Sequence, residues 1–315
     1  MKKIGNRGYW ALNLPPMVYL ILFFLIPSLI MTVAAFREPG EFGGLAPLYE
    51  QVGNQLTWNL TFSNFARLGE DAIYFNLFLK SAIYAAITTL ICLIMAYPVA
   101  WLIARSKKKN RDLLLLLAIL PFWSNFLVRI YAWMIILGPQ SILVKGINWF
   151  TAHLGMEPMQ FLFTAKAVII GMVYVNLPFM ILPLYTNLEK HDMALLDAAQ
   201  DLGANAWQRF WRITWPLSMP GVLAGSALVF VPSLGMFAIP DILGGTDAIM
   251  IGNLIKQQIL DSRDWPFGSV LALMLTLGVL LILAGTSWLA GGGLARLKQR
   301  KTLSKKQGEV HGSGR

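Results

Sequence analysis

Long apolar stretches separated by short polar connections dominate the pattern of this chain. Six stretches are each about as long as a helix that crosses a bilayer, and they lie at 15–36, 78–103, 113–137, 166–187, 217–240 and 269–290. About 20 mostly apolar residues span a hydrocarbon core as a helix. A membrane barrel would instead require many short alternating strands, and the sequence shows no such pattern. The pattern therefore predicts an all-α, polytopic bundle of six transmembrane helices.

Composition agrees with a membrane protein. Hydrophobic residues make up 56% of the 315 residues and charged residues 13%, and the mean hydropathy is +0.58, which excludes an ordinary soluble globular chain. We expect the six-span domain to cover residues 15–290, between an N-terminal segment at 1–14 and a basic tail at 291–315. The first stretch follows basic residues, as in a signal peptide. Its apolar run is longer than a signal-peptide core, so we expect it to be retained.

Basic and acidic residues fall in alternate connections between the predicted spans. Basic residues gather before residue 15, at 105–111, at 188–216 and after residue 290, whereas the other connections hold most of the acidic residues. Because basic loops stay on the cytoplasmic side, both termini and the 188–216 connection are predicted to be cytoplasmic. The net charge of +10 then reflects topology and contact with anionic membrane lipid. Nucleic acid is not expected as a partner.

The sequence does not assemble the residues of an enzyme, a metal site or an ATP site. Cys92 is the single cysteine, and the three histidines lie far apart at His153, His191 and His311, so no metal site is predicted. No phosphate-binding loop is present, so the chain cannot supply the ATP site of a P-loop ATPase, and any ATP must be hydrolysed by a partner. A membrane-embedded enzyme would need clustered acidic or histidine residues, and an ion-driven carrier would need buried carboxylates. The spans hold almost none, so we expect no catalytic residue and no bound cofactor.

The 188–216 connection contains a short polar segment rich in small residues. Asp192 can cap a helix from Ala194 to Leu202, and Gly203 can adopt the left-handed conformation that ends this helix. The small residues allow close approach by another protein, which favours a docking segment. The alternative is an amphipathic helix that lies on the membrane without a partner.

The spacing of this segment resembles the EAA loop of ABC-transporter permeases. That loop consists of Glu-Ala-Ala, three residues, Gly, nine residues and Ile-x-Leu-Pro. The resemblance implies the fold of a type I ABC importer permease, in which the loop contacts an ATP-binding cassette ATPase. Asp replaces the usual Glu and Trp215 replaces Leu, which conserves charge and apolar character. The matching positions are Asp197, Ala198, Ala199, Gly203, Ile213 and Pro216.

Short motifs that follow one another between about residues 70 and 275 resemble the PotB-type permeases of bacterial spermidine/putrescine importers. The resemblance implies a bacterial inner-membrane permease that works with a second homologous permease, an ATPase dimer and a periplasmic polyamine-binding protein. A permease for another small solute, such as 4-aminobutyrate or thiamine, is the alternative. The motifs are Tyr74-Phe75, Ala96-Tyr97-Pro98, Leu120-Pro121-Phe122-Trp123, Arg129-Ile130-Tyr131, Leu177-Pro178-Phe179, 249–253 and 263–268.

A flexible polycation needs carboxylates for its ammonium groups and aromatic faces along its methylene chain. Asp241 follows Pro240 at the outer end of the fifth predicted span, with Phe237 one turn earlier, and is the predicted carboxylate of the substrate path. Trp133 and Tyr174 lie in spans that can line such a path. Aromatic residues near span ends also form interface belts, and Asp241 can instead anchor a loop, so both interpretations stay open.

Arg129 is a strong base well inside the third predicted span. It shares a helical face with Asn125 and Trp133 at i, i+4 and i+8 spacing, and Asn125 is also a candidate path residue. A charge at this depth should face protein or water. We expect a structural role, in which Arg129 pairs with a carboxylate or with helix carbonyls. Snorkelling of the side chain outward is the alternative.

Two further features have open roles. Gly221 and Gly225 form a small-xxx-small motif, which suits close helix packing, including packing against the second permease. The predicted external segment at 37–60 is rich in Gly and Pro and carries several acidic residues.

Overall fold

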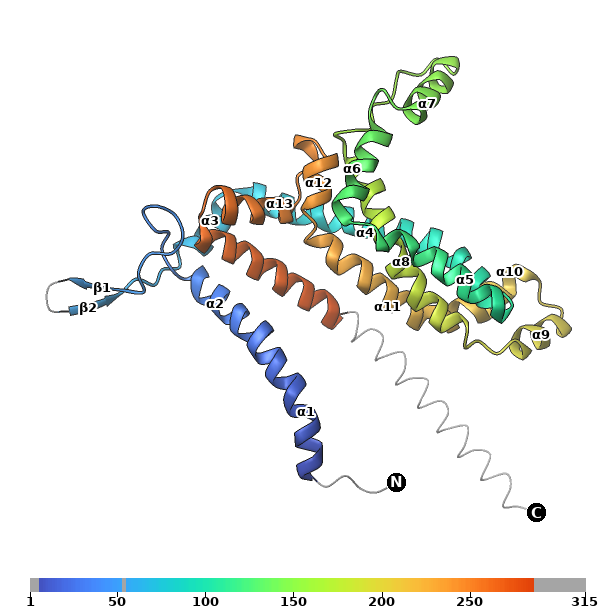
Figure 1. The fold of residues 1–315 in the computed structure, drawn as a ribbon, viewed down its shortest axis with the longest axis horizontal. Coiled ribbons are helices and arrows are strands. Elements are labelled where there is room, and N and C mark those ends of the chain that lie inside the picture. The colour runs from blue at the N-terminus through green and yellow to red at the C-terminus, as the bar shows by residue number, and fades with distance from the viewer. Residues whose placement is uncertain (1–5, 53–54, 286–315) are drawn as a thin grey trace. The chain divides into compact units, whose positions relative to one another are not determined.

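The computed structural model describes residues 6–52 and 55–285, which are mostly helical (Figure 1). The chain divides into two compact units, residues 1–271 and 272–315, and the described part of the second unit, 272–285, is helical. Outside the described residues lie the predicted basic tail at 291–315, the start of the predicted N-terminal segment and the end of the predicted sixth span. Within the described ranges, six helical segments are long and apolar enough to cross a membrane. The predicted six-span helical fold is confirmed.

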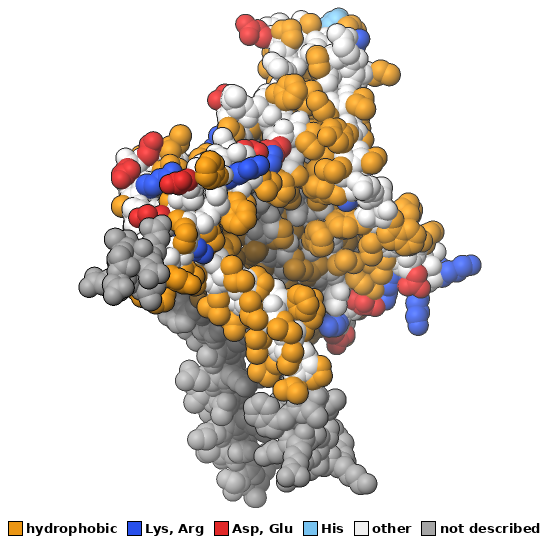
Figure 2. Space-filling model, turned by 60° about the vertical axis from the view of Figure 1, so that its left-hand side comes forward, with side chains coloured by type: hydrophobic (Ala, Val, Ile, Leu, Met, Phe, Trp, Pro, Cys, Tyr) orange, Lys and Arg blue, Asp and Glu red, His pale blue; other side chains and the backbone are white. Residues whose placement is uncertain are grey.

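Each of these segments overlaps one predicted stretch, and the largest differences are at the third and at the fifth, which begins and ends earlier than predicted. Figure 2 shows hydrophobic side chains over most of one face, with Lys, Arg, Asp and Glu side chains gathered in groups near its margins. Phe23 and Ile135 keep 68% and 76% of their surface exposed. Such surface fits contact with lipid or with other subunits. The segments are Asn13–Ala35, Ala72–Arg105, Phe126–His153, Ala165–Leu188, Ala206–Leu234 and Trp265–Gly285.

The segment predicted to be external forms a β-hairpin, which is a local departure from the predicted all-α fold. Its strands are antiparallel, and Tyr49 pairs with Trp58 in the register. The hairpin is joined through 59–62 to the short helix that precedes the second span. The elements up to this point are α1 (Asn6–Leu20), the π-helical η1 (Ile21–Leu25), α2 (Ile26–Ala35), β1 (Tyr49–Val52), β2 (Gln55–Trp58) and α3 (Ser63–Glu70).

Hydrogen bonds fasten the first part of this external segment, before the hairpin. The buried Asn64 side chain of α3 donates to the backbone carbonyls of Ala35 at 3.1 Å and Arg37 at 2.7 Å. The Gly44 N–H donates to the Arg263 carbonyl at 2.7 Å. Because these bonds satisfy backbone groups on chain segments far apart in the sequence, the segment is a fixed part of the first unit.

The third predicted span is not one continuous helix, so the prediction of a helix over 113–137 is wrong at residues 120–125. Pro121 lies in a 3₁₀ turn, and it lacks the N–H that an α-helix interior requires. A new helix then begins after Asn125, whose side chain accepts a hydrogen bond from the Leu127 N–H at 2.9 Å. The elements are α5 (Lys108–Ile119), η2 (Leu120–Trp123), α6 (Phe126–Leu137) and α7 (Ile142–His153).

Helix α8 (Ala165–Leu188) is the central helix of the first unit. Its C-terminal half packs against α4 (Ala72–Arg105) and α11 (Trp215–Leu234), and Figure 1 shows these three helices side by side. Its N-terminal half packs against α6 and α12 (Ala238–Leu243). Met172, Met180 and Leu184 are fully buried in these two cores. Burial of such side chains stabilises the packing by about 1.5–3 kcal/mol each.

The small-xxx-small motif packs within this chain. A Cβ atom at Gly221 would lie 2.7 Å from the Asn187 Cβ, and one at Gly225 would lie 2.7 Å from the Met180 Sδ. Both neighbours belong to α8. The two glycines therefore let α11 approach α8 closely, and this face is not available for packing against a second permease.

Candidate functional site

The segment predicted to dock on a partner begins as a capped helix. The Asp192 carboxylate accepts a hydrogen bond from the Ala194 N–H at 3.0 Å. Helix α9 (Ala194–Asp201) follows, with Asp197 in its first turn. Carboxylates near a helix N-terminus satisfy free N–H groups and interact favourably with the helix dipole. The predicted start of the helix is confirmed.

Gly203 ends α9 in the predicted left-handed conformation, with a φ of +80°. The Gly203 N–H donates to the Gln200 carbonyl and the Ala204 N–H donates to the Ala199 carbonyl, both at 2.9 Å. Together these bonds form a Schellman motif, which satisfies the last carbonyls of the helix. Within the part of the chain that the structure describes, nothing lies within 4 Å of the position of a Gly203 Cβ. Glycine is therefore required by the backbone conformation rather than by crowding within this chain.

Helix α9 presents an exposed surface of small, acidic and apolar residues. None of its residues is buried. Asp197 and Ala198 are exposed and Ala199 is half-buried. Leu202, which directly precedes Gly203, keeps 89% of its surface exposed. An apolar side chain that projects beside a small-residue surface fits a protein contact.

The chain returns from this segment to the core as one continuous helical element. A capping box between Asn205 and Gln208 starts it. Ile213 lies half-buried in its π-helical turn, and Pro216 lies in the first turn of α11. Of the six positions of the predicted motif, Asp197, Ala198 and Ala199 lie on α9, Gly203 lies in the turn that follows it, and Ile213 and Pro216 lie on the element that returns to the core. The connecting elements are α10 (Ala206–Arg209) and η3 (Phe210–Thr214).

Aromatic rings fill the contact between this returning element and α4. The ring of Tyr97 lies 5.5 Å from that of Phe210 and 5.8 Å from that of Trp215, measured between centroids. Trp211 lies 5.6 Å from both Trp207 and Trp215. Packed interiors of this kind transmit displacement because they compress little. Phe210 of η3 and Trp215 of α11 are therefore in direct ring contact with Tyr97 of α4.

Polar contacts hold the start of the docking segment. Glu189 forms an ion pair with Arg111 of α5. His191 Nε2 lies 3.2 Å from Asn187 Oδ1. Burial lowers the pKa of His191 below its ordinary value of 6.5, and the charge of Arg105 acts in the same direction, against a hydrogen bond with the Leu217 backbone.

A second candidate site lies where the fifth span ends, six residues earlier than the predicted end at residue 240. Helix α11 ends at Leu234, and the chain restarts as the short helix α12 after Gly235. A Cβ atom at Gly252 would lie 2.5 Å from the Gly235 carbonyl oxygen. The break therefore lets α13 (Ile251–Lys256) pack directly against the backbone of Gly235. Asp241 lies in the first turn of α12 rather than just beyond a span.

Both oxygens of the Asp241 carboxylate have partners on α13. Oδ1 accepts a hydrogen bond from the Asn253 amide, and Oδ2 accepts one from the Lys256 ammonium at 2.7 Å. Neither donor is among the residues predicted from the sequence. Their i, i+3 spacing places them on one helical face, but only the fold brings that face to Asp241.

The predicted aromatic path residues fall into separate contacts. Trp133 and Tyr174 meet edge to face with ring centroids 5.4 Å apart, and both are half-buried against the α6–α8–α12 core. Phe237 is 46% exposed, and its carbonyl accepts a hydrogen bond from Asn253 at 3.0 Å. Phe237 thus belongs with Asp241, whereas Trp133 and Tyr174 form a pair of their own.

Asn125 and Arg129 differ from the predictions. Asn125 precedes α6 as its N-cap, so the predicted helical face that begins at Asn125 is wrong. Arg129 is buried, with 8% of its surface exposed, and its guanidinium lies 4.9 Å from the centre of the Phe122 ring. Among the described residues it forms no ion pair. The sequence predicted pairing with a carboxylate or with helix carbonyls, whereas the contact found for Arg129 among the described residues is this cation-π contact.

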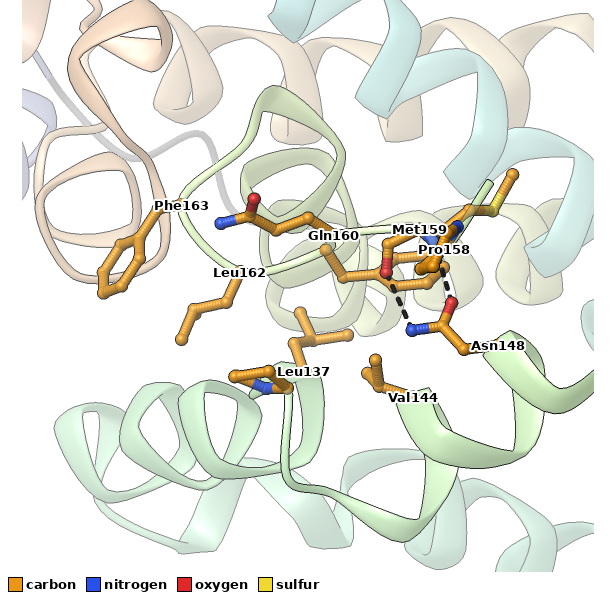
Figure 3. Close-up of a pocket in the computed structure, with 10 residues that line it drawn as sticks. Leu137, Val144, Asn148, Pro158, Met159, Gln160, Leu162 and Phe163 are labelled. Carbon is orange, nitrogen blue, oxygen red and sulfur yellow. Dashed lines mark hydrogen bonds between the residues drawn. The ribbon is translucent and has the colours of Figure 1, made fainter. Parts of the chain in front are cut away.

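A cavity of about 500 Å³ lies between α6, α7 and residues 158–163 (Figure 3). Asn148 and Gln160 are the polar side chains of its lining. Asn148 is already bonded to Met159, accepting from its N–H at 2.8 Å and donating to its carbonyl at 3.3 Å. The lining contains no carboxylate. The cavity therefore lacks the charge that a polycation requires.

Comparison with known proteins covers most of the chain. The family model described as binding-protein-dependent transport system inner membrane component matches residues 72–292. Three relatives described as spermidine/putrescine transport system permease protein PotB are each 42% identical to this chain. The match covers 84% of this chain and 88% of the protein from Salmonella typhimurium, 84% and 91% for Escherichia coli, and 90% and 94% for Haemophilus influenzae.

A solved structure has the same fold. It is the crystal structure of a bacterial ABC transporter involved in the import of the acidic polysaccharide alginate, with a TM-score of 0.64 and 17% identity. The match covers 89% of this chain and 93% of that chain. At this identity it supports the fold alone. The hairpin at 49–58 lies outside the range that the family model matches.

Proposed function

Because this chain belongs to the family of binding-protein-dependent transport system inner membrane components, we propose that it is the permease subunit of an ATP-driven polyamine importer. Spermidine and putrescine are the proposed solutes. The observation that carries this proposal is the 42% identity to PotB permeases over at least 84% of the chain. Family membership favours this function over an ion-driven carrier.

The proposed coupling site is the exposed α9 surface with its Gly203 turn. Asp197, Ala198 and Ala199 would face the ATPase, and Leu202 would insert beside them. Ile213 and Pro216 would carry the movement of α9 through the aromatic contact to α4 and α11. The support for this proposal is the Schellman turn, the exposure of Leu202 and the unbroken helix from α10 to α11.

The proposed partners follow from this role. An ATPase dimer would bind ATP and Mg²⁺ on the cytoplasmic side, so this subunit would itself catalyse no reaction and bind no cofactor. A second homologous permease would complete the solute path, and a periplasmic polyamine-binding protein would deliver the solute. The orientation with both termini in the cytoplasm stays a prediction from the distribution of basic residues.

The proposed solute contact on this chain is the Asp241 carboxylate with the neighbouring Phe237 ring. A carboxylate binds an ammonium group through a charge-assisted hydrogen bond, and an aromatic face attracts the same cation. Trp133, Tyr174 and Asn125 stay weaker candidates, since they are engaged in packing or helix capping.

The test is uptake by the complex reconstituted in proteoliposomes with its binding protein. Radiolabelled putrescine, spermidine, 4-aminobutyrate and thiamine would be compared, with ATP inside the vesicles. We expect ATP-dependent accumulation of a polyamine only. A complex with a hydrolysis-deficient ATPase controls for leakage. Accumulation of 4-aminobutyrate or thiamine without polyamine uptake would show that the solute assignment is wrong.

A further inference from the structure

Residues 235–243 contact α13 through close backbone packing and through the hydrogen bonds of the Asn253 side chain. Gly252 approaches the backbone of Gly235 so closely that a Cβ atom cannot be added. The Asn253 amide donates both to the Phe237 carbonyl and to Asp241 Oδ1, and its own oxygen accepts from the Met250 N–H at 3.0 Å. Asn253 is buried, with 8% of its surface exposed. The first oxygen of Asp241 is therefore held by a fully engaged, fixed donor.

The other side of the same carboxylate is open. Lys256 occupies Oδ2 from the last position of α13, and the side chains of Lys256 and Asp241 keep 35% and 33% of their surface exposed. The hydrogen bond and charge of Asp241 raise the pKa of Lys256 above its ordinary value, so this amine is an ammonium. An exposed pair of this kind is weak and exchanges readily.

A second lysine donates to an oxygen that lies close in the sequence to Asp241. Lys80 of α4 donates to the backbone carbonyl of Asp247, in the connection between α12 and α13. Lys80 also lies 5.8 Å from the centre of the Tyr84 ring. Residues 241–247, from α12 into the connection that follows it, thus already bind the ammonium groups of two lysines, one at the Asp241 carboxylate and one at the Asp247 carbonyl.

We propose that Lys256 is an internal competitor of the transported cation: its ammonium occupies Asp241 Oδ2 in the absence of solute, and an ammonium group of the solute displaces it. The inference rests on the proposed function. In this exchange one primary ammonium replaces another at the same oxygen, so the charge at the carboxylate is unchanged. Asn253 keeps Oδ1 in place. The solute class is an aliphatic amine, since its charged end matches a lysine side chain in charge, size and number of donors.

A competing role and a purely structural role for Lys256 predict opposite effects of its removal on solute transfer. If the lysine competes with solute, its removal frees the carboxylate and improves transfer. If it only clamps α13 to α12, its removal weakens the site and impairs transfer. When Lys256 occupies the carboxylate, the apparent affinity of Asp241 for the solute falls. The stability of an exposed ion pair sets the size of this fall, which is about two- to sixfold.

The experiment measures putrescine uptake by reconstituted wild-type, Lys256→Met and Lys256→Arg complexes at subsaturating concentrations of putrescine-loaded binding protein. We expect Lys256→Met to raise the uptake rate about two- to sixfold. Lys256→Arg keeps a cation at the carboxylate with additional donors and should give a rate at or below wild type. In an Asp241→Asn background, Lys256→Met should produce no increase.

Assembly is checked by copurification of the ATPase with each variant. An assembled Lys256→Met complex with an unchanged or lower rate would overturn the inference, as would an increase that persists with Asp241→Asn. Rescue of a slow Lys256→Met complex by Lys256→Arg would assign the lysine to a structural clamp. Absence of polyamine uptake by the wild-type complex would overturn the proposed function as well, which separates the two failures.

Discussion

The two oxygens of the Asp241 carboxylate have different partners, one a buried amide and the other an exposed ammonium. A single charge placed in this way can be tested with little change in shape, because asparagine has nearly the same volume as aspartate. The amide oxygen of asparagine can still accept from Asn253. The charge-assisted contact at the second oxygen is lost.

We predict that Asp241→Asn lowers polyamine transport efficiency roughly ten- to hundredfold, since a hydrogen bond to a charged group contributes about 1.5–3 kcal/mol. The measurement is uptake rate against the concentration of solute-loaded binding protein. Copurification of the ATPase and ATP hydrolysis by the assembled complex serve as controls. Wild-type uptake by a normally assembled variant would assign Asp241 to loop anchoring alone.

His191 gives a pH dependence at the entry to the docking segment. Because burial lowers its pKa in the folded protein below 6.5, the unfolded chain takes up the proton first as the pH falls. Stability is therefore unaffected above about pH 6.5, decreases as the pH falls below that value, and levels off below the lowered pKa. We predict that His191→Gln, which cannot be protonated, shows a smaller decrease in Tm between pH 7.5 and 5.5 than wild type. An equal decrease in both proteins would show that other groups cause the pH dependence.

At the scale of the helix, the contact of α8 with α11 depends on the absence of side chains at two positions. A larger residue at Gly225 would meet both the Met180 sulfur and the Met180 carbonyl, the latter 3.3 Å from the Cβ position. Backbone cannot move aside as a flexible side chain can. The two helices would have to separate along a face that forms much of the core.

We predict that Gly225→Leu destabilises the protein by about 1–3 kcal/mol, the usual range for overpacking a core. The measurement is thermal unfolding in detergent. Gly146 in α7 is the matched control, because nothing lies within 4 Å of its Cβ position. Gly146→Leu should leave Tm nearly unchanged or raise it. Similar Tm values for the two variants would contradict the close packing of α11 on α8.

Hydropathy predicted most of the helices because lipid imposes a minimum apolar length, and α4, α8 and the first span follow that rule. It could not locate the interruption at 120–125, since the residues on both sides are equally apolar. Pro121 was visible in the sequence, but many membrane helices accommodate proline. The end of α11 at Leu234 was hidden for a different reason. It is accompanied by the close approach of Gly252 to Gly235, a tertiary contact that a hydropathy pattern does not contain.

At the scale of the whole subunit, the docking segment and the Asp241 region lie at opposite ends of α11, as the order of elements requires. Any signal from an ATPase to the solute path along this route must pass through α11 and the helices packed on it. The docking segment was predictable because a cap, a small-residue run and a glycine are local signals. The pairing of Asp241 with Lys256 was not, because it requires the fold of α12 and α13.

We predict that Gly203→Val leaves the complex assembled in the membrane but abolishes solute-stimulated ATP hydrolysis. A β-branched residue at a φ of +80° is strained by about 1–3 kcal/mol, so the Schellman turn would reorganise and displace Leu202. ATP hydrolysis is measured with and without solute-loaded binding protein. Gly155→Val is the matched control, because Gly155 has a φ of +69° and equally open surroundings after α7. Full stimulation in Gly203→Val, or equal loss in Gly155→Val, would contradict a specific coupling role.

The open space around Gly203 has a consequence that concerns chirality. Since no atom of the described residues lies within 4 Å of the Cβ position, the turn disfavours an L-residue because of its handedness and not because of its volume. A D-amino acid favours positive φ, so D-alanine at this position would fit the turn better than glycine does and would restrict the unfolded chain. L-alanine, with the same atoms in mirror-image arrangement, would strain it. The proposed coupling segment thus depends on an achiral residue at position 203.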